Sequence, residues 1–121
     1  MGVGPAQRRD RAAKAMKRGT VVWVDLSDTY PPEMGKVRPA IVVSGTAHNE
    51  VLNTVVVVPT SSIAPEIWPL RLAVGSFAGK DSFAVIPGIR QVRKGRLKGA
   101  LGQLTHDKLA ELDECLDAYL R

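Results

Sequence analysis

Short apolar runs alternate with polar stretches rich in glycine and proline along most of this chain. The runs with the character of strands cover residues 20–26, 40–44, 51–58, 70–74 and 83–86. They consist mainly of β-branched and aliphatic residues, and the run at 51–58 is apolar on both faces after Thr54. Short strands at this spacing favour a small antiparallel sheet or barrel over βαβ units.

The last segment has the periodicity of an amphipathic helix. Apolar residues recur at helical spacing between Leu109 and Leu120, Thr105 is a suitable N-cap, and Asp107 falls in the first turn. We expect this helix to cover an open end of the sheet. The predicted fold class is therefore mainly β with a C-terminal helix, with an ordered loop at 29–37 and a glycine-rich turn at 75–79.

Length and composition limit the chain to one small domain. With 121 residues and 5% aromatics, it can build one core, mainly from aliphatic side chains. We divide it into a basic N-terminal extension, residues 1–17, and a barrel domain, residues 18–121. The single cysteine, Cys115, excludes an internal disulfide and suits a cytoplasmic protein, and no apolar stretch approaches the roughly 20 residues of a membrane span.

Positive charge is concentrated in two regions. The chain has 17 lysines and arginines against 12 acidic residues, a net charge of +5. The excess lies at the N-terminus and in residues 90–98, which favours a polyanionic partner over a merely solvated basic surface. Candidate nucleic-acid contacts in the second region are Arg90, Arg93, Lys94 and Arg96.

Two polar clusters stand beside apolar runs. Glu33 and Arg38 precede the run at 40–44, and Thr60, Ser61 and Ser62 follow the run at 51–58. If the two runs are neighbouring strands, an acid, an arginine and several hydroxyls meet at one end of the sheet. An arginine can hold two phosphate oxygens at once, hydroxyls can donate hydrogen bonds to phosphate, and a carboxylate can accept the proton of a ribose 2′-hydroxyl. This chemistry suits a phosphodiester.

Other chemistries lack support in the sequence. His48 and His106 are far apart and have no cysteine or aspartate pattern around them that would suit a metal site. The phosphate-binding sequence Gly-x-x-x-x-Gly-Lys is absent. We therefore predict that the protein uses no metal and no cofactor.

The order of several motifs resembles the MazF/PemK/Kid toxins of type II toxin–antitoxin systems. The matching segments run from Lys17 to the C-terminus, and they are residues 17–25 (KRGTVVWVD), Gly35, 38–44 (RPAIVVS), Asn49, 57–59 (VVP), 89–92 (IRQV), 96–97 (RL) and 102–104 (GQL). The resemblance implies a homodimer of small SH3-like barrels that cleaves single-stranded RNA without metal. It also implies products with 2′,3′-cyclic phosphate and 5′-hydroxyl ends, and an antitoxin that binds near the dimer groove.

The same resemblance assigns roles to individual residues. Arg38 matches the catalytic arginine, Glu33 the acidic residue five positions before it, and Ser61 the catalytic threonine, while Thr60 joins the catalytic set beside Ser61. Predicted RNA contacts are Lys36, Asn49, Ser62 and the four basic residues of the 90–98 region.

One departure from the family leaves alternatives open. Pro87 stands where many relatives have an aspartate, so members that use that aspartate in catalysis are not a full template. Trp23 and Trp68, the two tryptophans, are expected in the core or an interface. A barrel that only binds nucleic acid or protein is therefore a second hypothesis, and a gyrase-poisoning toxin of the same fold is a third.

Overall fold

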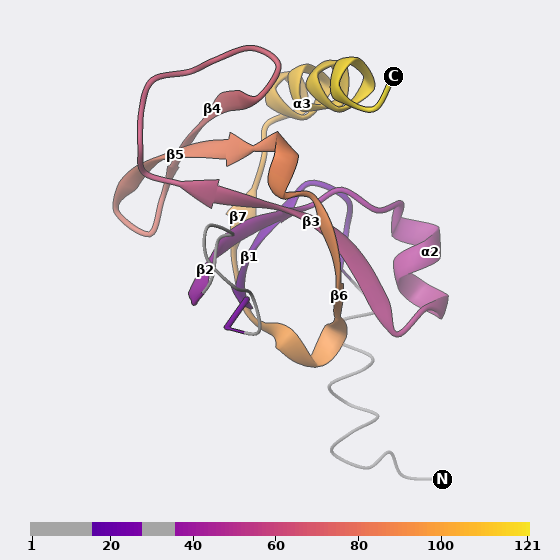
Figure 1. The fold of residues 1–121 in the computed structure, drawn as a ribbon. Helices are drawn as coiled ribbons and strands as arrows, with labels where there is room; N and C mark the ends of the chain where they lie inside the picture. Colours follow the sequence, from indigo (N-terminus) through magenta and orange to yellow (C-terminus); the bar gives the residue numbers. More distant parts are fainter. Residues whose placement is uncertain (1–15, 28–35) are drawn as a thin grey trace, which may run out of the picture.

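The computed structural model describes residues 16–27 and 36–121, and in this part of the chain seven strands form one curled antiparallel sheet (Figure 1). This architecture confirms the predicted barrel-like β fold with a C-terminal helix. The strands are β1 (Thr20–Asp25), β2 (Val37–Val42), β3 (Thr54–Ser61), β4 (Arg71–Phe77), β5 (Lys80–Val85), β6 (Arg90–Arg93) and β7 (Leu97–Gln103). The helices are α2 (Thr46–Val51) and α3 (His106–Tyr119), with short 3-10 turns at Ile86–Gly88 and Lys94–Arg96.

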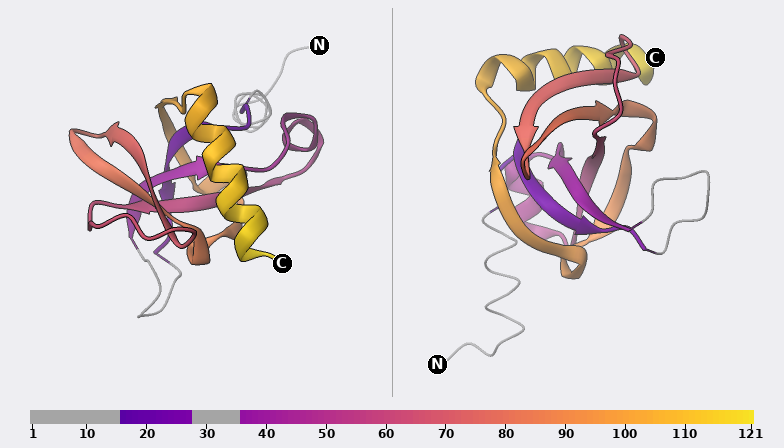
Figure 2. Two further views of the ribbon diagram at one scale, coloured as in Figure 1. Left: turned by 90° about the horizontal axis from the view of Figure 1, so that it is seen from above. Right: turned by 90° about the vertical axis from the view of Figure 1, so that its left-hand side faces the viewer.

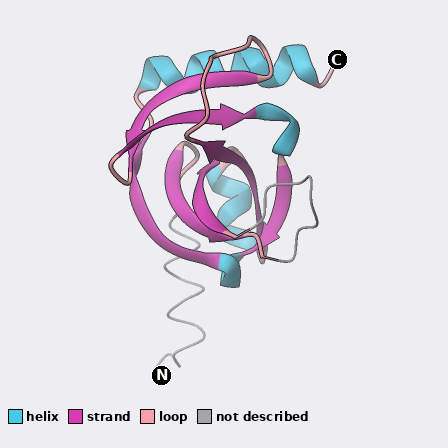
Figure 3. Cartoon of the chain, turned by 60° about the vertical axis from the view of Figure 1, so that its left-hand side comes forward, coloured by secondary structure: helices cyan, strands magenta, loops and turns pink. Residues whose placement is uncertain are grey.

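Strand β3 organises the sheet because its partners change along its length. The main strand order is β4-β5-β3-β2-β1-β7, and β6 also pairs with β3. One edge of β3 pairs first with β6, from Thr54 to Val57, and then with β5, at Thr60 and Ser61. The other edge pairs with β2 only from Val57 to Pro59. These changes of partner let the strands wrap around a common interior (Figure 3).

Two clusters of buried side chains fill the fold, and the alternation of side chains along β3 assigns residues to each. Val55 and Val57 pack inside the barrel, whereas Val58 packs on the opposite face, against a cluster that includes Leu112 and Cys115 of α3. Figure 2 shows α3 lying across the curled sheet, and Leu112 and Cys115 of this helix belong to the second cluster. The helix therefore covers one face of the sheet, as its apolar periodicity predicts.

Several boundaries differ from the prediction. Strand β2 begins at Val37, three residues before the predicted start at Ala40, so Pro39 lies inside the strand. Pro39 is tolerated there because the pairing of β2 with β3 starts only at Ala40, which leaves no ladder hydrogen bond for a proline to remove on that edge. Strands β4 and β5 extend to Phe77 and Lys80, so the predicted turn at 75–79 shrinks to two residues.

Other elements were not predicted. Val51 ends α2, a helix of six residues that is too short to reveal a helical period, and β3 consequently starts at Thr54. Strands β6 and β7 were missed because most of their residues are exposed and β7 carries two glycines, so neither shows strand periodicity. They pair with β3 and β1 through backbone contacts that a hydrophobic pattern does not report.

The C-terminal helix agrees with the sequence closely. It starts at His106, and the Thr105 hydroxyl accepts a hydrogen bond from the Lys108 amide at 3.2 Å, as expected of an N-cap. Asp107 lies in the first turn, where a negative charge suits the helix dipole. Among the described residues, no helix is both long and apolar enough to cross a membrane. Most of the predicted extension, residues 1–15, and most of the predicted loop, residues 28–35, lie outside the described residues.

Because Cys115 of α3 is buried, we expect the fold to lose stability at alkaline pH. Burial raises the pKa of this thiol above 9.0, and nearby carboxylates add to the effect. Above pH 9 the unfolded chain loses the thiol proton while the folded chain keeps it, so the unfolded state gains stability. We expect the free energy of unfolding to fall as pH rises through the range in which an unburied thiol ionises, by up to about 1.4 kcal/mol per unit. Urea unfolding of Cys115→Ala should show a smaller decrease over that range, and an identical decrease would contradict this account.

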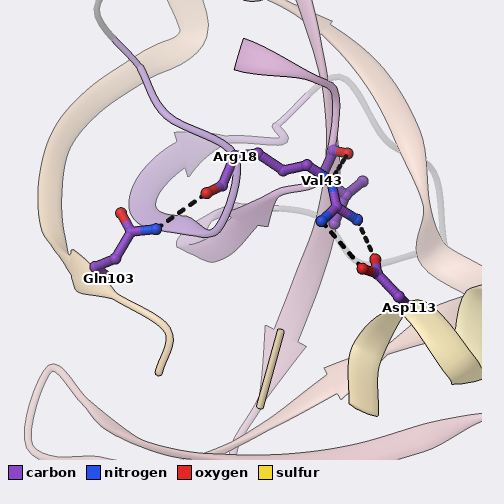
Figure 4. A network of polar contacts seen from close by, with 4 residues as sticks. All are labelled: Arg18, Val43, Gln103 and Asp113. Carbon is purple, nitrogen blue, oxygen red and sulfur yellow. Dashed lines mark hydrogen bonds and ion pairs between the residues drawn. The ribbon is translucent and has the colours of Figure 1, made fainter. Parts of the chain in front are cut away.

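Arg18 joins three parts of the fold just before β1. Its guanidinium donates to both carboxylate oxygens of Asp113 on α3, and its Nε donates to the Val43 carbonyl at 2.9 Å (Figure 4). Its own carbonyl accepts a 3.0 Å hydrogen bond from Gln103 of β7. A bidentate pair of this kind fixes α3 relative to the ends of β2 and β7.

Removing this ion pair should destabilise the fold modestly. Both side chains remain partly exposed, at 29% for Arg18 and 46% for Asp113, so solvent weakens the attraction. We expect Arg18→Ala to lower the free energy of unfolding by about 1–2 kcal/mol, including the lost bond to Val43. The control is Arg121→Ala, which breaks a more exposed arginine pair with Asp117 and should cost less than about 0.5 kcal/mol. Equal losses in urea unfolding would contradict a special role for Arg18.

Candidate functional site

Arg38 and the hydroxyl cluster meet where β2 and β3 separate. The ladder between the two strands ends at the pair Ala40 and Pro59. Beyond it, side chains supply the hydrogen bonds: the Thr60 hydroxyl donates to the Pro39 carbonyl at 2.8 Å, and Arg38 Nη1 donates to the Thr60 carbonyl at 3.3 Å. The arginine is thereby held at the opening between the strands. The sequence-based expectation that these two runs are neighbouring strands is confirmed.

The separation of the strands leaves a pocket of about 280 Å³. Arg38 lines it from β2, Ser61 and Ser62 from the end of β3, and Lys80 and Ser82 from β5. None of the described lining residues has a carboxylate, so the charge of the described walls is positive. The full described lining is Trp23, Val37, Arg38, Pro39, Thr60, Ser61, Ser62, Phe77, Ala78, Lys80 and Ser82.

The three hydroxyls of this cluster have different environments. Ser61 is half-buried, and its oxygen accepts a 3.1 Å hydrogen bond from the Ile63 amide, which leaves its proton available to an acceptor in the pocket. Ser62 is exposed at the rim. Thr60 is only 2% exposed, and its proton is committed to Pro39. Thr60 therefore positions β2 against β3, and its membership of the catalytic set stays a prediction.

Tertiary contacts place two aromatic residues on the pocket wall, a position that the sequence did not predict for them. Trp23 lies opposite Pro39 in the β1–β2 pairing and is half-buried on the pocket wall, and Phe77 joins it from the end of β4. Trp68 is 61% exposed, so neither tryptophan belongs to the core. Trp23 stands in the motif at residues 17–25, but no local signal places it beside Phe77, because their shared position depends on strand pairing.

Three further residues from the sequence analysis are not among these described lining residues. Glu33 falls outside the described residues. Pro87 is exposed in the turn Ile86–Gly88, and the pocket walls described above do not include it. Lys36 is exposed immediately before β2.

A second basic pocket of about 470 Å³ lies at the other end of β3. Arg90, Arg93 and Arg96 line it together with Thr54, Gln91 and Val92. Arg96 Nη1 donates to the Asp25 carbonyl at 3.3 Å, and hydrogen bonds from Ser27, helped by Arg96 and Lys98, lower the pKa of the Asp25 carboxyl. Thr54 and Ser61 are seven residues apart on β3, so the two pockets lie roughly 23 Å apart along the strand.

Asn49 and Lys94 belong to the interior instead. The Asn49 side chain is fully buried and bonds to Ser44 and to the Met16 carbonyl, while Lys94, 6% exposed, donates to the Asn49 carbonyl. These contacts join α2 to the chain before β1 and to the turn after β6. In this conformation both side chains bond within the fold, and the RNA contacts predicted for them stay predictions.

Comparison with known proteins identifies the family. Residues 17–120 match the family model described as PemK-like, MazF-like toxin of type II toxin–antitoxin system. The Endoribonuclease MazF of Staphylococcus epidermidis is 32% identical over 109 residues, covering 87% of this chain and 91% of that protein. The crystal structure of MazF (Form-I) from Deinococcus radiodurans superposes with a TM-score of 0.76 at 25% identity, covering 88% of this chain and 96% of the other.

A structure of MazE–MazF (Form-III) from Deinococcus radiodurans gives a TM-score of 0.70 at 25% identity, again over 88% of this chain and 96% of the matched one. The likeness thus extends over nearly the whole described fold in both sequence and structure. The chain belongs to the PemK/MazF family of type II toxins.

Proposed function

We propose that this protein is an endoribonuclease toxin that cleaves single-stranded RNA in the cytoplasm without a metal ion. The observation that carries the proposal is the position of Arg38 beside Ser61 in an open pocket whose described lining has no carboxylate. Such a pocket attracts a phosphodiester and supplies donors to its oxygens. The naming of its Staphylococcus relative as an endoribonuclease supports the same activity.

The reaction would proceed by attack of the ribose 2′-oxygen on the adjacent phosphorus. The new O2′–P bond forms as the P–O5′ bond breaks, leaving a 2′,3′-cyclic phosphate and a 5′-hydroxyl. The 2′-hydroxyl proton passes to a base, for which Glu33 is the candidate, and the leaving 5′-oxygen takes up a proton from water. Arg38 would neutralise the charge that grows on the phosphorane, and Ser61 would donate to a non-bridging oxygen.

RNA would extend from this pocket over neighbouring surfaces. Trp23 and Phe77 offer aromatic surface on the pocket wall on which a base can stack. Ser62 lies exposed at the rim and Lys36 is exposed just before β2, so both could meet the RNA backbone. Arg90, Arg93 and Arg96 would bind backbone phosphates in the second pocket. Contacts of this kind predict binding that weakens steeply as salt concentration rises.

Protein partners follow from the family. A MazE–MazF structure is among the solved relatives, and we propose that a cognate antitoxin likewise neutralises this protein near the groove of a homodimer. Exposed apolar side chains on the described surface favour such contacts. They include Ile67, Trp68 and Leu120, which are 50%, 61% and 65% exposed.

The function is tested by incubating the purified protein with a long single-stranded RNA in EDTA and mapping the ends. Discrete cuts with 2′,3′-cyclic phosphate and 5′-hydroxyl termini, absent with Arg38→Ala, are expected. Intact RNA at high protein concentration would contradict the proposal and favour a barrel that only binds its partners. DNA breakage that depends on gyrase, without RNA cleavage, would favour the gyrase-poisoning alternative.

A further inference from the structure

The hairpin of β4 and β5 places a second cation at the pocket between β2 and β3. Lys80, the first residue of β5, lines the pocket together with Arg38. The two approach from different sides of β3, since β5 pairs with one edge of that strand and β2 with the other. Among the described lining residues, Arg38 and Lys80 are the cations.

The backbone around Lys80 is firmly positioned. Ala78 and Gly79 form the two-residue turn, with positive φ angles of 55° and 76°, and the register pairs Phe77 with Lys80. Positive φ at both turn positions matches the tight hairpin turn whose twist suits the strands. The Ser76 hydroxyl donates to Asp81 across the hairpin at 2.7 Å, and the Ser82 hydroxyl donates to the Lys80 carbonyl at 3.2 Å.

Packing holds the same hairpin against the rest of the sheet. Phe77 packs on the buried cluster beneath α3 and lies over Gly102 of β7, where a ring carbon is 3.4 Å from the position a Cβ would take. The hairpin tip is thus anchored at Phe77, while the Lys80 side chain is exposed at the pocket. A long cationic side chain on a fixed backbone can adjust its own conformation to reach a phosphate group, while the backbone stays in place.

We propose that the Lys80 ammonium binds a non-bridging oxygen of the phosphodiester held by Arg38. This inference rests on the proposed function and adds a second charged donor to it. Arg38 binds phosphate through a planar fork, whereas lysine acts as a compact charge that suits a single oxygen. The two cations enclose the phosphate from both edges of β3 and counter the negative charge that increases in the transition state.

Substitution of Lys80 tests the contact by two measurements. Lys80→Ala is expected to lower kcat/KM for RNA cleavage about 10- to 100-fold, as the loss of one charged hydrogen bond implies, and Lys80→Arg is expected to restore most of it. The matched control is Lys108→Ala on α3, which removes the same charge outside the described pocket lining and should leave kcat/KM unchanged. Equal rates for Lys80→Ala and the control would overturn the proposal.

Binding provides a readout that does not depend on cleavage. The probe is a 2′-O-methylated single-stranded RNA, which lacks the attacking hydroxyl. The slope of log affinity against log salt should decrease in magnitude by about 0.7 in Lys80→Ala, the value for one lost phosphate contact, and stay constant in Lys108→Ala. An unchanged slope in Lys80→Ala would overturn the contact.

Failure of the Lys80 inference can be distinguished from failure of the proposed endoribonuclease function. If the wild-type protein cleaves RNA while Lys80→Ala matches it in both rate and slope, the inference fails and the endoribonuclease function stands. If the wild-type protein cleaves no RNA, the proposed function fails, and the salt slope alone decides whether Lys80 binds phosphate. Thermal unfolding curves of Lys80→Ala and Lys108→Ala should coincide with the wild-type curve, because Lys80 is exposed.

Discussion

Arg38→Ala is expected to lower kcat for RNA cleavage by about 10²- to 10³-fold or more, because it removes the donor fork that we propose binds the reacting phosphate. Arg38→Lys keeps the charge but loses the fork, so we expect it to recover only part of the rate. The measurement is single-turnover cleavage of a defined RNA in EDTA, which reports the chemical step without product release. Full activity of Arg38→Ala would exclude the pocket between β2 and β3 as the active site.

A control separates this effect from a general loss of charge or stability. Arg121→Ala removes the same charge from the exposed C-terminus and should cleave RNA at the wild-type rate. Arg38 also donates to the Thr60 carbonyl, so urea unfolding of Arg38→Ala should accompany the kinetics. A loss of rate at unchanged folded fraction assigns the effect to catalysis.

Leu112→Ala should produce the largest loss of stability among these substitutions. Leu112 is fully buried where α3 packs on the sheet, and truncation there removes apolar contacts and leaves a cavity. We expect the free energy of unfolding to fall by about 2–5 kcal/mol. For a domain of this size that corresponds to a decrease in Tm of about 8–20 °C.

The matched control is the same substitution at Leu52, which is 51% exposed after α2. Leu52→Ala should change the free energy of unfolding by less than about 0.5 kcal/mol. Differential scanning calorimetry of both variants makes the comparison. Similar shifts in Tm would mean that the contact between α3 and the sheet contributes little to the fold.

Part of the candidate-site arrangement was predictable from local sequence. Arg38 and Ser61 each stand next to a run of β-branched residues, and strand propensity predicts both runs as strands, whereas their pairing is decided by the fold. The family motifs then identify which polar residues matter. The structural contacts of Thr60 and Asn49 could not be predicted from the sequence, because a sequence does not distinguish a buried hydroxyl or amide from an exposed one.

The positions of Trp23, Phe77 and Lys80 required the tertiary structure. Each comes from a different strand, and the pocket exists only because the ladder between β2 and β3 stops at Ala40 and Pro59. A register shift between Ala73 and Gly75 and the positive φ of Gly75 accompany the extra length of the hairpin. Strands β4 and β5 stay paired beyond the residues that the hydrophobic pattern predicts as strand. Such long-range pairing leaves no periodic signal in the chain.

The sequence by itself therefore determined the β-rich fold class, the capped C-terminal helix and the family, because each depends on residues close together or on an ordered set of motifs. Only the tertiary structure decided which side chains share the pocket. Strand pairing brings together residues that are distant along the chain, and burial then divides them between those that position the backbone and those that are open to the pocket.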